Sequence, residues 1–317
     1  MAFLGARIMG LLELFITACM PVLNMLLVTG VGSFLATDSV GILGKEARKH
    51  LNYVVFYVFN PALIATYLAK TITMESMARL WFMPVNVFFT FIFGLIFGWI
   101  VIKVTGAPLK LRGLILGCCS AGNLGNIFLI IIPALCKEKG SPFGAPDVCQ
   151  TYGLAYSSLS LAIVGFIIGG TPLIRNALIG DDAPLRVLRE SGELIGGAAV
   201  PSVTLIMGGN LITGLRGTAS VPPSVIAGVV LVRFVLLPLV GTALVKAAVR
   251  YGVIRPDPLY QFVLLLQYAV PPAMNIGTIT QLFGVGESEC SVIFVWVYAL
   301  ASVAVTMWSA FFMWTLS

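Results

Sequence analysis

The sequence predicts an all-α membrane protein with many spans, and three observations indicate this fold class. Hydrophobic residues make up 59% of the 317 residues and charged residues only 10%, whereas about a quarter of an average soluble protein is charged. The mean hydropathy is +1.01. The apolar residues also form long blocks, each close to the ~20 residues that a helix needs to cross a bilayer. This combination excludes a soluble enzyme, a disordered chain and a nucleic-acid-binding module, so we predict an all-α polytopic membrane protein.

Nine apolar blocks have the length of a membrane span, so we expect about nine spans in this chain. They cover residues 11–35, 51–69, 80–104, 111–136, 152–174, 194–212, 222–249, 259–283 and 291–316. The first block is longer than the apolar region of a signal peptide, and we therefore expect it to be retained.

The net charge of +6 resides in short loops between the blocks, which is typical of residues that set membrane topology. With nine spans, most loop Lys and Arg residues fall on one side of the membrane, and the other side receives Lys70, Arg79, Lys137, Lys139 and Arg216. This bias favours two halves that run parallel, whereas many transporters contain inverted halves. Both arrangements stay open at this point.

Internal similarity predicts that the chain contains two repeats of five helices. Pro61 and Pro201 follow charged segments at the same spacing, and residues 122–127 correspond in order to residues 271–276. Each match is weak, but matches that recur in the same order indicate a duplication.

The boundary between the repeats falls within one apolar block. We place the first transmembrane repeat at residues 1–163 and the second at residues 164–317. Residues 147–174 match both the last helix of the first repeat and the first helix of the second. Both of those helices are therefore truncated, and a central segment is missing near residues 161–164.

Two interrupted helices at corresponding repeat positions predict the functional site. Asn123 and Asn126 lie in mid-block among glycines, and Pro271 and Pro272 precede Asn275 in the matching block. Glycine loosens the helical ladder and proline removes a hydrogen-bond donor, so we expect both helices to unwind. Helix N-termini and asparagine amides then offer N–H groups to an anion. The alternative is that glycine permits close helix packing and proline only kinks the helix.

Other polar residues inside the apolar blocks allow both structural and functional roles. Arg233 lies well inside its block, where it would either bind a substrate carboxylate or pair with Glu193 or a backbone carbonyl; we favour the pairing. Tyr156 and Tyr298 would line a cavity or pack between helices, and we favour packing. Neither interrupted helix contains Asp or Glu, which argues against sodium coupling and leaves proton coupling open.

The chain shows no pattern of an enzyme or a metal protein. Its six cysteines include no CxxC pair, so we expect small buried hydrophobic residues rather than disulfides or a zinc site. We find no phosphate-binding loop and no nucleophile–histidine–acid constellation. We therefore expect no catalytic residues, no metal site and no cofactor.

Three segments together resemble the plant PIN-LIKES proteins of the auxin efflux carrier superfamily, and the similarity covers nearly the whole chain. They are Gly122-Asn-Leu-Gly-Asn126, Asp182-Ala-Pro-Leu-Arg186 and Gln267-Tyr-Ala-Val-Pro-Pro-Ala-Met-Asn-Ile-Gly-Thr-Ile-Thr-Gln-Leu-Phe-Gly284.

The resemblance implies ten helices in two inverted five-helix repeats, with the fourth and ninth helices broken and crossing in the membrane. It also implies a multi-pass protein of the endoplasmic reticulum membrane that controls intracellular accumulation of auxin, chiefly indole-3-acetic acid. The chain departs from the family by lacking the hydrophilic central loop and its flanking half-helices; an odd number of helices would leave the halves parallel. The expected substrate-binding residues are Asn123, Asn126, Pro271, Pro272, Asn275 and Gln267.

The leading hypothesis is a carrier that binds an organic anion such as auxin at the crossing and works by alternating access. Its expected partners are this small molecule and membrane lipid, with no nucleic acid. One alternative is a sodium-coupled organic-anion symporter of the bile-acid type, and another is a truncated regulatory membrane protein that does not transport. An intramembrane enzyme would need a convergent acid–base pair or metal ligands, which the sequence does not offer.

Overall fold

The computed structural model describes residues 23–71, 80–124, 128, 131–132, 135–136, 143–149, 186–216, 221–283 and 285–316. Within these ranges the chain is helical and contains no β-strand, which confirms the all-α prediction for the described residues. The predicted first block before residue 23, the fifth block at 152–174, and the residues Asn126 and Tyr156 lie outside the described residues.

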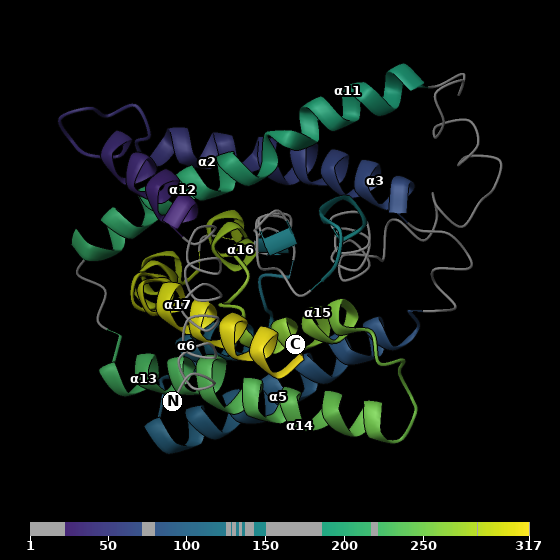
Figure 1. The fold of residues 1–317 in the computed structure, drawn as a ribbon. Coiled ribbons are helices and arrows are strands. Elements are labelled where there is room, and N and C mark those ends of the chain that lie inside the picture. Colours follow the sequence, from purple (N-terminus) through teal and green to yellow (C-terminus); the bar gives the residue numbers. More distant parts are fainter. Residues whose placement is uncertain are drawn as a thin grey trace, which may run out of the picture.

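The helices form two layers (Figure 1). The upper layer contains α2 (Lys45–Val54), α3 (Asn60–Thr71), α11 (Arg186–Gly197) and α12 (Ala199–Arg216). The other layer contains α5 (Phe82–Thr105), α6 (Leu109–Ser120), α13 (Pro223–Leu231), α14 (Leu237–Arg250), α15 (Pro258–Ala269) and α17 (Glu287–Leu316). The short helix α16 (Asn275–Phe283) lies between the layers.

Among the described residues, four helices are long and apolar enough to cross a membrane. They are Phe82–Thr105, Arg186–Ile212, Pro223–Arg250 and Glu287–Leu316, and they correspond to four of the nine predicted blocks. A shorter apolar helix spans Leu23–Leu35. The predicted blocks at 111–136 and 259–283 do not form single helices, because each contains an interruption. The total of nine spans stays a prediction.

Prolines widen two of the helices without ending them. The π-helical segments Val55–Phe59 and Val232–Leu236 come shortly before Pro61 and Pro238. A proline ring clashes with the carbonyl four residues earlier and leaves it without its helical donor. The carbonyl of Phe234, four residues before Pro238, instead accepts a hydrogen bond from Nε1 of Trp308 at 2.9 Å. The second π-helical segment is therefore tied to α17.

Helices from the two halves of the chain pack in opposite directions. Gly192 on α11 faces Thr66 of α3, and Gly209 on α12 faces the side chain of Arg48 in α2. The later residue of α11–α12 thus contacts the earlier residue of α2–α3, so the two helix pairs run antiparallel. Gly228 on α13 likewise packs against Val101, near the end of α5. These contacts are so close that a Cβ on any of the three glycines would overlap the facing atoms.

Two ion pairs bring the start of α17 to the same end of the molecule as the starts of α2 and α6. Nζ of Lys45 lies 3.8 Å from Glu287, and Nζ of Lys110 lies 3.3 Å from Glu289. In a parallel nine-span arrangement, the segment before α17 would lie across the membrane from both lysines. The packing of these helices therefore does not follow the parallel arrangement that the charge bias favours.

Candidate functional site: the crossing of two interrupted helices

Both predicted interruptions are present in the structure. The helix α6 ends at Ser120, and the next residue, Ala121, is extended with φ −80° and ψ 108°. The helix α15 ends at Ala269, and Val270 is extended with φ −79° and ψ 149° before α16 begins at Asn275. The glycine at position 122 and the proline pair after Val270 account for these breaks, because neither supports a continuous helical ladder.

The two interruptions lie against each other and share backbone hydrogen bonds. Gly122 and Pro272 form an isolated antiparallel bridge. The N–H of Asn123 donates to the carbonyl of Pro271 at 2.9 Å, and the N–H of Ala273 donates to the carbonyl of Ala121 at 2.9 Å. These bonds satisfy backbone groups that the unwound helices would otherwise leave unpaired in an apolar interior.

The glycine at position 122 allows close packing at the crossing. A Cβ there would lie 3.0 Å from Cγ2 of Val270 and 3.3 Å from Nη1 of Arg233. Both distances are shorter than ordinary van der Waals contact, so a side chain at this position would push the side chains of Val270 and Arg233 away by a few tenths of an ångström.

A polar cluster, formed by Asn123, Tyr298 and Arg233, surrounds the crossing. We call it the crossing cluster. Nδ2 of Asn123 donates to Oη of Tyr298 at 3.1 Å, and Oη of Tyr298 donates to the carbonyl of Pro272 at 2.5 Å. All three side chains of the cluster are buried. The helix α17, which carries Tyr298, therefore holds both interrupted segments together.

Arg233 reaches the crossing from the π-helical segment Val232–Leu236. Its Nε donates to the carbonyl of Cys118 at 2.6 Å. This carbonyl lies in the last turn of α6, where the break removes its helical donor. Of the two pairings that we considered, the carbonyl pairing is therefore present, whereas Glu193 pairs with Arg189 at 3.5 Å.

The other predicted site residues occupy different surroundings. Pro271 and Pro272 are buried at the crossing, and Asn275 is exposed at the first position of α16. Gln267 is buried away from these contacts, because its Oε1 accepts from Nδ2 of Asn86 on α5 at 2.6 Å. The structure thus brings together Asn123 and the two prolines, places Asn275 next to them and holds Gln267 against α5.

Comparisons with a family model and with individual proteins identify the same family for this chain. The family model described as "membrane transport protein" matches residues 17–169 and 161–309. In Arabidopsis thaliana, PIN-LIKES 1 is 48% identical over 382 aligned residues, covering 96% of this chain and 81% of the relative. PIN-LIKES 3 is 46% identical, covering 96% of this chain and 98% of the relative, and PIN-LIKES 7 is 39% identical, covering 98% and 100%. The chain belongs to the PIN-LIKES family of membrane transport proteins.

The alignments also show that the PIN-LIKES relatives contain residues without a counterpart here. The alignment with PIN-LIKES 1 spans 382 positions, which is more than the 317 residues of this chain. The two ranges matched by the family model meet at residues 161–169. The missing central segment of this PIN-LIKES chain, predicted near residues 161–164, falls at the same point.

A narrow pocket lies beside the crossing, between the two layers of this PIN-LIKES protein. Asn52 of α2 and Asn210 of α12 line one wall, and Met274, Glu287 and Phe294 line the other. Met274 directly follows the residue that bonds to Ala121, so the pocket reaches the crossing from the side of α16.

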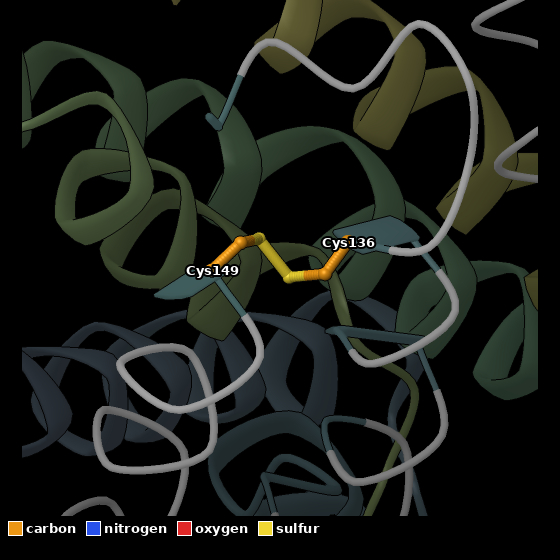
Figure 2. Close-up of a disulfide and its surroundings, with 2 residues drawn as sticks. All are labelled: Cys136 and Cys149. Carbon is orange, nitrogen blue, oxygen red and sulfur yellow. A yellow bond between two sulfur atoms is a disulfide. The ribbon is translucent and has the colours of Figure 1, made fainter. Parts of the chain in front are cut away.

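A disulfide joins Cys136 and Cys149, whose Cα atoms are 5.5 Å apart (Figure 2). Our prediction that the cysteines are small buried hydrophobic residues is wrong for this pair. It is right for Cys118, Cys119 and Cys290, which are free and buried. The spacing of 13 residues carries no recognisable motif, and the pairing depends on how the chain returns between these positions.

Sequence reasoning considered Arg233 and Tyr298 but favoured packing or structural pairing for both. The structure places both in the crossing cluster. The available signal was the position of an ionisable side chain inside an apolar block, which marks functional sites in membrane proteins. It did not show that the residue lies beside the two interrupted helices.

Proposed function

We propose that this protein is a carrier that binds auxin, chiefly indole-3-acetic acid, at the helix crossing and moves it across the endoplasmic reticulum membrane. The observation that carries the proposal is the direct backbone pairing of the two interrupted helices beside a buried polar cluster. Unwound helices at matching positions of two repeats are the best sequence pointer to a transporter site.

The lengths of the helices support a crossing deep in the membrane. Both α6 and α15 contain 12 residues before their breaks. At 1.5 Å per residue each extends about 18 Å, which is somewhat more than half of a hydrocarbon core about 30 Å thick. A small amphipathic anion bound at this depth has its carboxylate at the polar cluster and its ring against apolar side chains.

We infer that the two halves, residues 1–163 and 164–317, are inverted five-helix repeats. The opposed directions of α2–α3 against α11–α12, and the ion pairs at the start of α17, support this inference. Inverted repeats place one broken helix from each half at the same depth. The family arrangement has ten spans. It results if the missing central segment completes the last helix of the first repeat and the first helix of the second.

The proposed ligand contacts come from both interruptions. Asn123, Asn126 and Asn275 contribute amides, and Pro271 and Pro272 keep the second helix open. Asn275 also begins α16, where free backbone N–H groups and the helix dipole favour an anion. Gln267 is the remaining predicted contact, and its hydrogen bond with Asn86 also supports α15.

Alternating access follows from the two-layer architecture. The pocket between the layers is narrow, and its walls come from α2 and α12 on one side and from α16 and α17 on the other. A relative movement of the layers widens this pocket and gives the ligand a path to the crossing.

The Cys136–Cys149 disulfide supports a location in the endoplasmic reticulum. Disulfides persist in oxidising compartments, including the lumen of this organelle, and are rare in the cytosol. We propose that the segment between these cysteines faces the lumen and that the lysines paired with Glu287 and Glu289 face the cytosol.

The direct test is uptake of labelled indole-3-acetic acid by vesicles that contain the purified chain. We expect uptake to fall about tenfold in Asn275→Ala, which corresponds to a loss of about 1.4 kcal/mol of ligand binding. Asn24→Ala, at another exposed helical position, is the matched control and should transport normally. Absence of uptake by folded wild-type protein would refute the carrier proposal, and uptake that requires sodium would favour the bile-acid-type alternative.

A further inference from the structure

The guanidinium of Arg233 has unused hydrogen-bonding capacity at the crossing. Arg233 is the largest fully buried side chain among the described residues. Its Nε is bonded to Cys118, but Nη1 and Nη2 have no hydrogen-bond partner in the part of the chain that the structure describes. Nη1 lies 3.3 Å from the position that a Cβ on Gly122 would occupy, so these free donors lie beside the paired backbone segments.

Among the residues that the structure describes, no carboxylate neutralises the charge of Arg233. The titratable groups that face it are the thiols of Cys118 and Cys119 and the phenol of Tyr298. None of these is a carboxylate, and Glu193 is engaged with Arg189. A buried cation without a counter-ion is strongly unfavourable, and in membrane proteins such residues mark substrate or ion pathways.

A purely structural role accounts for the hydrogen bond of only one of the three guanidinium nitrogens of Arg233. The bond from Nε satisfies the carbonyl that the break in α6 leaves free. The two Nη groups form the flat edge that binds a carboxylate through two parallel hydrogen bonds. In addition, Arg233 lies on a π-helical segment, a feature found frequently at functional sites.

We propose that Arg233 binds the carboxylate of the transported molecule through Nη1 and Nη2 and serves as its counter-ion at the crossing. This inference rests on the proposed carrier function and deepens it, because it names the residue that binds the carboxylate of the substrate. The bound pair is electrically neutral, so a neutral analogue of the same shape leaves the arginine charge uncompensated and binds weakly.

The test measures binding of indole-3-acetate and of its neutral analogue indole-3-acetamide to the purified full-length chain. We expect wild-type protein to bind the acetate about 100-fold more tightly than the amide, since hydrogen bonds between charged groups are about twice as strong as neutral ones and an ion pair is added. In Arg233→Met this preference should disappear through weaker binding of the acetate, with binding of the amide unchanged. Arg255→Met, at an exposed arginine, is the matched control and should retain the preference.

A second variant, Arg233→Lys, tests whether the geometry of the guanidinium contributes in addition to its charge. Arg233→Lys retains the charge but loses the two-pronged geometry, so its preference should lie between those of wild type and Arg233→Met. Equal binding of acetate and amide by wild-type protein, or an unchanged preference in Arg233→Met, would overturn the role of Arg233.

A wider ligand panel also separates the failure of this inference from the failure of the proposed function. If wild-type protein binds phenylacetate or benzoate but not indole-3-acetate, and Arg233→Met loses that binding, the carboxylate site stands and the auxin assignment fails. If no carboxylate in the panel binds, both are overturned.

Discussion

Two buried polar clusters in this protein differ in how completely their hydrogen bonds are satisfied. The first is the crossing cluster of Asn123, Tyr298 and Arg233. The second, which we call the support cluster, consists of Asn86 on α5 with Gln267 and Tyr268 on α15.

The side-chain amide of Asn86 is the centre of the support cluster. Its Nδ2 donates to Oε1 of Gln267 at 2.6 Å and to the carbonyl of Leu264 at 3.1 Å, and its Oδ1 accepts from Oη of Tyr268 at 3.1 Å.

The support cluster holds helices in place, whereas the crossing cluster has donors that a ligand would engage. Satisfied buried networks rigidify the parts that they join, whereas free buried donors carry an energetic cost that a bound acceptor removes. The support cluster holds α15, and with it the segment that leads into the crossing. In the crossing cluster, Nη1 and Nη2 of Arg233 have no hydrogen-bond partner within the described ranges of the chain.

The largest expected effect concerns the packing of the support cluster. In Gly241→Ala, the new Cβ would overlap Cδ2 and Cγ of Tyr268, so the ring has to move or α14 has to shift. We expect a loss of about 3 kcal/mol of stability, typical of overpacking, and a lower melting temperature in detergent. Gly30→Ala is the control, because nothing lies within 4 Å of its added Cβ, and its melting temperature should match wild type. A stable Gly241→Ala variant would show that Tyr268 is not held in place.

The next effect removes the hub of the support cluster. Asn86→Leu removes the amide that donates to Oε1 of Gln267, and it leaves Oη of Tyr268 only the long contact of 3.5 Å to the carbonyl of residue 86. Because an unsatisfied buried polar group costs about 1–3 kcal/mol, we expect a loss of about 2 kcal/mol of stability and a melting temperature below wild type. Asn24→Leu, at an exposed position, serves for comparison. A loss of uptake without any loss of stability would instead mean that this cluster contacts the ligand.

A smaller effect on stability is expected at the crossing cluster. Tyr298→Phe removes one hydrogen bond to Pro272 and one to Asn123. We expect a loss of about 1 kcal/mol of stability, together with a clear fall in the rate of uptake, because the two interrupted segments lose their common tie. Melting curves and uptake assays on the same preparation measure both effects. If Tyr298→Phe loses as much stability as Asn86→Leu, the two clusters do not differ in their structural role.

The smallest expected effect on stability has the opposite sign. In ligand-free protein, Arg233→Met removes a buried charge that has no carboxylate partner among the described residues, and it retains most of the side-chain volume. Replacement of buried charges by apolar groups is often neutral or stabilising, so we expect a gain of up to about 1 kcal/mol despite the lost bond to Cys118. A melting temperature far below wild type would indicate that the bond to Cys118 is the main role of Arg233.

Much of the site was predictable from local chemistry. Gly122, Pro271 and Pro272 interrupt helices wherever they occur in such a pattern, because their effects on backbone torsion and hydrogen bonding act within one or two turns. The interruptions were therefore identified without knowledge of any long-range contact. The substrate role of Gln267, which begins one of the family motifs, stays a prediction, and the structure places its side chain in the support cluster.

Hydropathy and residue order were enough to establish an all-α membrane protein, to locate the two interruptions and to indicate the family, because these properties depend on composition and on short-range backbone chemistry. The tertiary structure was needed to show that the interruptions pair with each other, that α11–α12 runs against α2–α3, and that Cys136 bonds to Cys149. It also placed the free donors of Arg233 at the crossing. These features arise from contacts between residues far apart in the chain, and neither the charge bias of the loops nor the spacing of the cysteines encodes which distant segments meet.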